Sequence, residues 1–342
     1  MVNVLNNVIK GISNNVSNVV NIPSGLAAIY KPKGWSSAEV VYKLRVLMRD
    51  GLQARTGCSK RKSIIKVGHG GTLDPLAQGV LVVGFGKGTK LMDTYLSGIK
   101  AYQAIAKLGY ETDSYDANGA ITETVDSTHV TYDMLENALQ QYRGDILQTP
   151  PMYSALKIDG QRLYTLARQG LEVDREARPV TTYKLELVRK PHPYLLAETN
   201  DINSELNLPL FGLDIECSGG FYVRSIIRDV ARYDAHNTIL YYTIRYHILL
   251  LFKSIFVYAI MLNRSCDARA HQVDLLRTRQ GPFLLDHCLH EHEWNFDSIC
   301  EHIIATSKLV DLDVSTIRPA VEVEVRATVR GTSKPRVPVT TV

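Results

Sequence analysis

The hydrophobic and polar positions of the chain follow two different periods, which predict a mixture of strands and helices. Continuous apolar runs of strand length occur in LAAIY, VLVVGFG and YQAIAKLGYET, at residues 26–30, 80–86 and 102–112. Residues 180–188 and 210–218 have the pattern of antiparallel sheet strands.

Helical spacing of apolar residues predicts amphipathic helices between these strands. In WSSAEVVYKLRVLMRD the apolar residues recur at this spacing, and Ser36 or Ser37 can cap the helix. Residues 134–144, which follow Thr131, and residues 163–170, which end at a glycine, have the same character. Because helices and strands mix without a regular βαβ order, the sequence predicts an α+β fold around a mainly antiparallel sheet.

One stretch, residues 234–265, departs from this pattern. It is rich in Ile, Leu, Tyr and Phe and has no acidic residue after Asp234. A membrane span needs about 18–20 uncharged apolar residues, whereas Arg245, His247 and Lys253 interrupt this stretch. The pattern therefore disfavours a transmembrane helix, and no membrane association is expected.

The composition is that of a folded globular protein. The 342 residues, of which 45% are hydrophobic, can form one large domain or two ordinary ones. A net charge of +4 permits a polyanionic partner without requiring one. The five cysteines form no CxxC pair, so neither a disulfide framework nor a zinc ribbon is indicated, and a reducing, intracellular compartment fits.

The first 24 residues are Asn-rich, with one lysine, no arginine and no unbroken apolar block. This composition argues against a signal peptide and against an Arg-rich transit peptide. We therefore expect residues 1–24 to be a poorly ordered leader.

The turn GHGGTLDPLAQG contains a single carboxylate, that of Asp74. A carboxylate held between glycines and a proline suits a nucleophile or a base that needs a fixed position. An ordinary Asp-Pro turn is the alternative, and the local pattern alone favours it. The loop before this turn carries five basic residues, which indicate either a solvated surface or a contact with phosphates: Arg55, Lys60, Arg61, Lys62 and Lys66.

Two further clusters combine aromatic and basic residues. In CSGGFYVRSIIRDVAR, Tyr222 and Arg224 would share one face of an extended segment, and arginine is a natural fixed partner for a carboxylate. The segment QTPPMYSALKIDGQRLYTLARQG offers cations for phosphates and rings for stacking. These are Lys157, Arg162, Arg168, Tyr153 and Tyr164.

Seven blocks together resemble, in the same order, the TruB family of tRNA pseudouridine synthases, which includes the eukaryotic Pus4-like enzymes. The resemblance covers about residues 25–283, and chance recurrence of seven ordered blocks is not credible. In the KPKG turn, Lys31 is expected to be structural or to contact the backbone. The blocks are KPKGWSS, GHGGTLDPLAQGVLVVGFGKGTKL, KAYQAIAKLGYETDSYDANG, PPMYSALKIDGQRLYTLARQG, EVDREARPVTTY, CSGGFYVRSIIRDVAR and LLRTRQGPF.

The resemblance implies an isomerase that converts a T-loop uridine of tRNA to pseudouridine (the pseudouridine-55 reaction) without a cofactor or a metal. It implies a pseudouridine synthase fold over residues 25–290, in which helices flank a mixed, mainly antiparallel sheet and an RNA-binding cleft crosses it. Asp74 matches the aspartate that the family requires. Whether this carboxylate attacks C1′ or removes the C2′ proton stays open.

Five other residues match positions of the family's substrate pocket. Tyr102 matches the tyrosine that stacks on the target base, and Tyr222 lines the same pocket. Arg224 matches the arginine that pairs with the carboxylate, and Leu275 matches an apolar contact to the base. His69 matches a histidine that occupies the place of the flipped T-loop bases, although a lone histidine is more often structural.

Two segments depart from the family pattern. Residues 234–265 separate residues that the pattern makes neighbours, Tyr233 and Cys266, and their composition is that of translated AT-rich noncoding DNA. A retained intron is the leading hypothesis, which uninterrupted reads across the segment in mature mRNA would exclude. Residues 291–342 are too few for the full PUA-type RNA-binding domain of bacterial members, and we expect a disordered or loosely docked tail. The tract DHCLHEHEW, at 286–294, matches no zinc spacing, which favours a solvated turn over a metal site.

Three functions compete. A stand-alone tRNA uridine isomerase is favoured, and a tRNA-folding chaperone without turnover is the alternative if residues 234–265 disrupt the site. The short C-terminus disfavours an RNA-guided catalytic subunit of the dyskerin-like kind. The expected partner is tRNA through its T-arm, with mRNA as a further candidate, no obligate protein partner and a monomeric state. The sequence does not distinguish nucleus, cytoplasm and mitochondrion.

Overall fold

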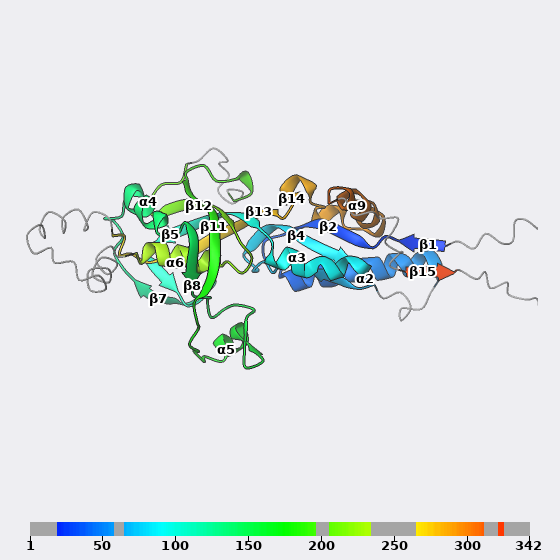
Figure 1. The fold of residues 1–342 in the computed structure, drawn as a ribbon, viewed down its shortest axis with the longest axis horizontal. Coiled ribbons are helices and arrows are strands. Elements are labelled where there is room, and N and C mark those ends of the chain that lie inside the picture. The colour runs from blue at the N-terminus through cyan, green and yellow to red at the C-terminus, as the bar shows by residue number, and fades with distance from the viewer. Residues whose placement is uncertain (1–18, 58–64, 196–204, 234–264, 311–320, 325–342) are drawn as a thin grey trace, which may run out of the picture.

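The computed structural model of the protein describes residues 19–57, 65–195, 205–233, 265–310 and 321–324 (Figure 1). One large sheet runs through this part of the chain, and helices pack against it in two groups. The prediction of an α+β fold around a mainly antiparallel sheet is confirmed.

The large sheet has nine strands, seven of them in the order β2-β4-β13-β5-β12-β11-β8. Two short strands extend it, since β3 pairs with β4 and β14 pairs with β13. Every pairing is antiparallel except that of β4 with β13, which is parallel. The strands are β2 (Gly25–Lys31), β3 (Val67–His69), β4 (Ala77–Phe85), β5 (Lys100–Leu108), β8 (Gly144–Gln148), β11 (Arg178–Val188), β12 (Leu210–Cys217), β13 (Ala270–Gln280) and β14 (Phe283–Leu284).

Helices and short elements complete the described fold. The α-helices are α2 (Ser37–Thr56), α3 (Met92–Ser97), α4 (Tyr132–Gln140), α5 (Leu163–Arg168), α6 (Val223–Ala231) and α9 (Phe296–Lys308). Single-turn helices are η1 (Gly86–Leu91), η2 (Pro193–Leu195), η3 (Leu285–His287) and η4 (Glu291–Glu293). Three two-stranded pairs stand apart from the large sheet: β1 (Val19–Ile22) with β15 (Val321–Glu324), β6 (Tyr110–Thr112) with β7 (Ile121–Thr124), and β9 (Lys157–Ile158) with β10 (Gln161–Arg162).

Two apolar cores hold the helices on the sheet. At one end, α4 and α6 cover β5, β12 and β13, and Ile226, Ile227 and Val230 of α6 are fully buried there. At the other end, α2 and α9 cover β2 and β4 (Figure 1), with Leu44 and Ile303 fully buried. Each such side chain contributes about 1.5–3 kcal/mol by leaving water. Each core thus fixes one group of helices on its half of the sheet.

The predicted start of α2, with Ser36 as one of its two candidate caps, is confirmed. Ser36 caps α2, because its hydroxyl accepts from the backbone N–H of Glu39, and the Glu39 carboxylate accepts in return from the Ser36 N–H. This reciprocal capping box satisfies two N–H groups that the first turn leaves without helical partners. The helix extends to Thr56, so the prediction that Arg55 lies in a loop is wrong. Most of the basic loop itself, residues 58–64, lies outside the described residues.

The described residues nearest to both ends of the chain are more ordered than the sequence predicts. The poorly ordered leader is wrong for residues 19–22, which form β1 and pair with residues 321–324 of the predicted tail. The loosely docked tail is wrong for α9, because Ile299 and Ile303 pack fully buried against the α2 side of the sheet. The partners of these two side chains lie on β2 and α2, far away in the sequence. Residues 1–18, 311–320 and 325–342 lie outside the described residues.

Within the described part of the chain, no helix combines the length and the apolar character that crossing a bilayer requires. Residues 234–264, the unusual apolar segment, lie outside the described residues, so the retained-intron hypothesis stays a prediction. The residues on either side of this segment are described, and they contact each other directly.

Hydrogen bonds join the end of α6 to the residues before β13, on the two sides of residues 234–264. The N–H groups of Cys266 and Asp267 both donate to the carbonyl oxygen of Tyr233, at 3.0 and 3.3 Å, and Ala268 donates to Ala231 at 2.8 Å. The backbones on the two sides of residues 234–264 are therefore in direct contact.

We predict that deleting residues 234–265, so that Tyr233 is bonded to Cys266, leaves the fold intact. The free energy of unfolding should be unchanged or higher, because closing a long loop costs conformational entropy. Thermal unfolding of both proteins, followed by circular dichroism, measures the effect. A deletion variant that is insoluble, or that unfolds at a much lower temperature, would show that the segment supports the fold.

Candidate active site

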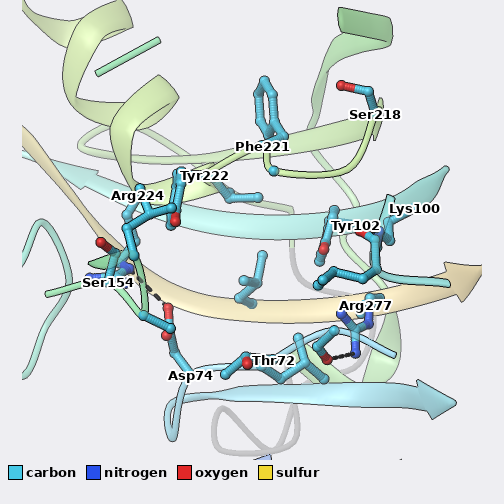
Figure 2. A pocket seen from close by; sticks show the side chains of 18 of the residues that line it. Thr72, Asp74, Lys100, Tyr102, Ser154, Ser218, Phe221, Tyr222, Arg224 and Arg277 are labelled. Carbon is cyan, nitrogen blue, oxygen red and sulfur yellow. Dashed lines mark hydrogen bonds and ion pairs between the residues drawn. The ribbon is translucent and has the colours of Figure 1, made fainter. Parts of the chain in front are cut away.

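A cavity of about 540 Å³ lies over β5 and β13 and is lined by the Asp74 turn and by the start of α6. All six residues that the sequence analysis singled out line it: His69, Asp74, Tyr102, Tyr222, Arg224 and Leu275. They come from five separate elements, over more than half of the chain. The volume is in the range of small-ligand pockets. Figure 2 shows Asp74 and Arg224 on one side of this cavity, and Tyr102, Lys100 and Arg277 on the other.

The turn that carries Asp74 is held by the last residue of β2 and the first residue of α2. The Lys31 ammonium, fully buried, donates to the carbonyl oxygens of Pro32, Pro75 and Ala77. Burial is the main reason that the pKa of Lys31 falls to about 8. The expectation that Lys31 contacts the backbone is confirmed, and the contact fixes the turn on the C-terminal side of Asp74.

Leu73, the residue before Asp74, is held by a second contact, which comes from Ser37 at the start of α2. The Ser37 hydroxyl donates to the carbonyl of Leu73 at 3.0 Å and accepts from its N–H at 2.8 Å. The turn then closes on itself, since the Ala77 N–H donates to the Asp74 carbonyl at 3.0 Å. Backbone bonds on both sides thus determine the position of the Asp74 side chain, as a reacting group requires.

Arg224 makes an ion pair with Asp74. Its Nε lies 2.9 Å from Oδ2 of Asp74, and its two terminal nitrogens donate to the carbonyls of Ser114 and Tyr153, at 2.8 and 2.7 Å. The Arg224 side chain is 5% exposed, whereas that of Asp74 is 36% exposed. The arginine is therefore a fixed, buried partner, while the carboxylate keeps a face open to the cavity.

Tyr222 and Arg224 do not lie on an extended segment, and that prediction is wrong. Tyr222 is the residue immediately before α6, which begins at Val223, so Arg224 lies in the first helical turn. The backbone of Tyr222 is held by Gln148, whose amide accepts from its N–H at 2.8 Å and donates to its carbonyl at 3.0 Å. Both side chains line the cavity from the start of α6.

Tyr102 and Leu275 lie on neighbouring strands of the sheet beneath the cavity. Leu275 of β13 pairs with Ala104 of β5, and both residues are almost fully buried. Burial raises the pKa of the Tyr102 phenol, which lies against the Arg277 guanidinium. The two side chains form an apolar surface beside the Asp74–Arg224 pair, of the kind that a planar ring can pack on.

His69 ends β3 at the rim of the cavity. Its Nδ1 accepts from the Gly71 N–H at 3.3 Å, and burial, followed by the charge of Arg277, lowers the pKa of the imidazole. The same residue also lines a neighbouring groove, together with Arg45 and Lys66. His69 therefore stands between the cavity and a cationic groove, where no carboxylate is among the lining residues.

Sequence reasoning did not single out two buried cations of this cavity, Lys100 and Arg277. Arg277 donates to the carbonyls of Val80 and Gly71 at 2.6 and 3.2 Å. The backbone of Arg277 lies this close to β4 only because Gly79 has no side chain. A Cβ atom on Gly79 would lie 2.3 Å from the Arg277 carbonyl oxygen. Both cations lie inside the quoted blocks KAYQ and LLRTRQ, but a strand period alone does not tell which face of the sheet becomes the cavity.

The described residues contain no group of three or more His, Cys, Asp or Glu side chains arranged to hold a metal ion. In the tract 286–294, the His290 ring stacks on Tyr30 at 4.7 Å, and the buried Trp294 indole donates to the Leu289 carbonyl. The tract is thus partly packed on the sheet, where the sequence predicted a solvated turn.

Comparison with known proteins identifies related chains. The family model described as TruB family pseudouridylate synthase (N terminal domain) matches residues 59–223. Pseudouridylate synthase TRUB1 of Homo sapiens is 38% identical over 296 residues, which are 85% of this chain and 71% of that protein. The tRNA pseudouridine synthase B of Clostridium perfringens (strain SM101 / Type A) is 34% identical over 288 residues, 84% of this chain and 77% of that protein.

Among solved structures, a crystal structure of a Cbf5–Nop10–Gar1 complex aligns with a TM-score of 0.44 at 22% identity. The alignment covers 78% of this chain and 52% of the matched one. A structure of an H/ACA RNP bound to a substrate RNA containing 2′-deoxyuridine aligns with a TM-score of 0.42 at 18% identity, over 86% of this chain and 59% of that one.

We expect Lys100 to make the folding stability of the protein depend on pH. Its ammonium donates to the carbonyls of Leu96 and Gly98 at 2.6 and 2.7 Å, and burial lowers its pKa from 10.5 to about 8. Between these values the unfolded chain binds more protons at Lys100 than the folded one, so this residue's contribution to stability rises with pH.

We predict that wild type gains stability relative to a Lys100→Met variant as the pH rises from about 8 to about 10.5. Denaturant unfolding of the two proteins at several pH values measures the difference, in which the other titrating groups cancel. A Lys87→Met variant is the control, because an exposed lysine has similar surroundings in the folded and unfolded chain. A difference that stays constant, or that falls with pH, would contradict the prediction.

Proposed function

The chain belongs to the TruB family of pseudouridylate synthases and converts uridine in tRNA to pseudouridine, and we propose that Asp74 is the catalytic residue of this reaction. The observation that supports the proposal is the ion pair of Asp74 with the buried Arg224, at 2.9 Å, on the wall of a cavity of about 540 Å³. A carboxylate so fixed, with one face open, can act on the sugar of a nucleotide that enters the cavity.

The reaction is an isomerisation, in which atoms and electrons balance without a cofactor. The bond between N1 of uracil and C1′ breaks, and its electron pair leaves with the base. The base turns over, a bond forms between C5 and C1′, and the proton on C5 is lost while N1 gains one. Asp74 serves either route of bond cleavage, as a nucleophile at C1′ or as a base at C2′.

The apolar surface of the cavity suits the detached base. Tyr102 and Leu275 offer a ring and an aliphatic side chain on which a flipped uracil can stack. Tyr222 lies near the Asp74–Arg224 pair at the start of α6, where it can close the pocket over the base. We assign these three residues to base binding, as the family resemblance implies.

We propose that the RNA enters as the T-arm of tRNA and follows the cationic groove past His69. Arg45 and Lys66 line this groove, and both are exposed. His69, at its junction with the cavity, occupies the place from which the T-loop bases flip. The basic segment around β9, β10 and α5 adds three exposed cations away from the sheet: Lys157, Arg162 and Arg168.

Other properties follow the same proposal. A monomer without an obligate protein partner suffices, because all the residues of the site come from one chain. Messenger RNA with a similar loop is a further candidate substrate. An RNA substrate suits an intracellular site of action, and so do the four described cysteines, which are free thiols.

We predict that Asp74→Asn abolishes conversion and leaves tRNA binding nearly unchanged. Loss of a nucleophile or base should lower turnover by at least about 10³-fold. Incubation with an unmodified tRNA transcript, followed by chemical mapping of pseudouridine, measures it, with Asp93→Asn on the surface of α3 as the control. Turnover by Asp74→Asn would refute the assignment. Binding without turnover by the wild type would instead favour a tRNA-folding chaperone.

The RNA path is tested by a double variant, Arg45→Gln with Lys66→Gln. Each phosphate contact that is lost should lower the slope of log affinity against log salt by about 1. We therefore expect weaker tRNA binding with a smaller salt dependence, and turnover at saturating tRNA should be unchanged. Lys308→Gln, an exposed lysine on α9, is the control. An unchanged salt slope in the double variant would place the RNA elsewhere.

A further inference from the structure

A second, smaller pocket lies at the start of α2, outside the cavity that Asp74 lines. Its volume is about 320 Å³, and the residues that line it, here called the α2 pocket, are Gly34, Trp35, Glu39, Tyr42 and Lys43. The function proposed above gives none of these side chains a role. With two aromatic rings, one carboxylate and one ammonium, the α2 pocket differs chemically from the cationic groove at His69.

The two rings of the α2 pocket belong to the fold but keep accessible surface. Trp35 is half-buried and packs edge to face against Trp294, with the ring centroids 6.0 Å apart. Tyr42 lies within α2 and is 66% exposed. Tyrosine is a weaker helix former than alanine, lysine or glutamate. Neither burial nor helix propensity therefore accounts for a tyrosine at this position, whereas a ligand that stacks on the ring does.

The charges of the α2 pocket indicate an uncharged, planar ligand. Its carboxylate and its ammonium, those of Glu39 and Lys43, balance each other, and the Glu39 carboxylate accepts from the Ser36 N–H at 2.7 Å. A phosphate would meet the carboxylate, and a metal ion would meet the ammonium. A protein partner needs a contact area of about 800 Å², which five residues do not provide. A nucleobase fits, because it stacks on aromatic rings and its N–H groups donate to a carboxylate.

The α2 pocket adjoins the turn that carries Asp74. The N–H of Gly34 donates to the carbonyl oxygen of Pro75, the residue after Asp74, at 2.8 Å, and both Gly34 and Pro75 are exposed. Gly34 has a φ of +87°, and apart from its chain neighbours no heavy atom lies within 4 Å of the place that a Cβ would take. The surface between the cavity and the α2 pocket is therefore short and open.

We propose that the α2 pocket binds one unpaired base of the RNA strand that leaves the cavity on the Asp74 side. This inference depends on the function proposed above. The target nucleotide occupies the cavity, and its strand continues over Pro75 and Gly34. The next base within reach stacks against Trp35 and Tyr42, with Lys43 close to its phosphate. The enzyme thus holds a second nucleotide besides the one that it isomerises, which fixes the RNA while the target base turns over.

The first test measures turnover of a T-arm stem-loop RNA by the full-length protein and by a Tyr42→Ala variant. Stacking of one base on an aromatic ring corresponds to about a 5- to 150-fold change in affinity, so KM should rise by at least about 5-fold. Turnover at saturating RNA should be unchanged, because Tyr42 does not touch the reacting nucleotide. Tyr42→Phe retains the ring and should keep the wild-type KM.

Tyr183→Ala is the matched control for Tyr42→Ala. It removes a tyrosine ring that is likewise exposed, at 55%, but that lies on β11, which β12 separates from the strands under the cavity. Neither KM nor kcat should change in this variant.

The second test finds the base that occupies the α2 pocket. In a series of stem-loop RNAs, each unpaired nucleotide other than the target is replaced in turn by an abasic nucleotide. At one position this replacement should raise the KM of the wild type and have no further effect on the KM of Tyr42→Ala. The two changes are not additive there, because both remove the same contact.

Tryptophan fluorescence gives a readout that does not depend on turnover. The chain has two tryptophans, and Trp294 is only 7% exposed. A base that stacks on Trp35 should quench the emission of the wild type when the stem-loop RNA is added. Trp35→Phe keeps an aromatic ring and should still bind the RNA, but its remaining emission should not be quenched.

Three results would overturn the proposal. One is a KM of Tyr42→Ala equal to that of the wild type, and another is quenching that is absent or the same in wild type and Trp35→Phe. The third is an abasic series in which every effect adds to that of Tyr42→Ala, which would assign this surface to another ligand, such as a protein. Failure of the proposed function is distinguishable, because in that case the wild type itself converts no uridine or Asp74→Asn remains active.

Discussion

The ion pair of Asp74 with Arg224 is the constraint around which the rest of the site is organised. The two residues are 150 positions apart in the sequence. Each is held in place by contacts with other segments of the chain. Lys31 and Ser37 hold the Asp74 turn from the start of the chain. Ser114 and Tyr153 hold the guanidinium from the opposite side. The attraction between a carboxylate and a guanidinium is strong at 2.9 Å in a partly buried site. Its geometry is nevertheless determined by backbone carbonyls, which cannot move independently of the fold.

The two apolar cores explain how such distant segments reach one cavity. The α4–α6 core carries Arg224, and the α2–α9 core carries the segment that holds Asp74. The sheet connects them, because β4 and β13 pair in parallel directly beside the cavity. Lys100 and Arg277 are buried in this same region. Buried polar groups destabilise a fold unless something compensates for them, and their concentration around one cavity is typical of a site adapted to a ligand and not to stability alone.

The hydrogen bonds that join Ala231 and Tyr233 to residues 266–268 bear on the unusual segment between them. They close the end of α6 onto the start of β13 at the place where the family pattern has a direct connection. Described residues on either side of residues 234–264 make these contacts, and Arg224 and Leu275 line the same cavity. A sequence separation that looked disruptive is bridged locally by three backbone hydrogen bonds.

By itself, the sequence determined the local features of this protein, because they depend on residues that are close together in the chain. The capping of α2 at Ser36 and the buried strand at residues 80–86 are of this kind. The order of the seven blocks also gave the family and the six expected site residues. Only the tertiary structure decided that α9 belongs to the core, that a helix begins directly after Tyr222, and that Lys100 and Arg277 line the cavity. The physical reason is that burial and facing depend on which strands pair across the sheet, and a period of two residues leaves both faces equally open until that pairing is made.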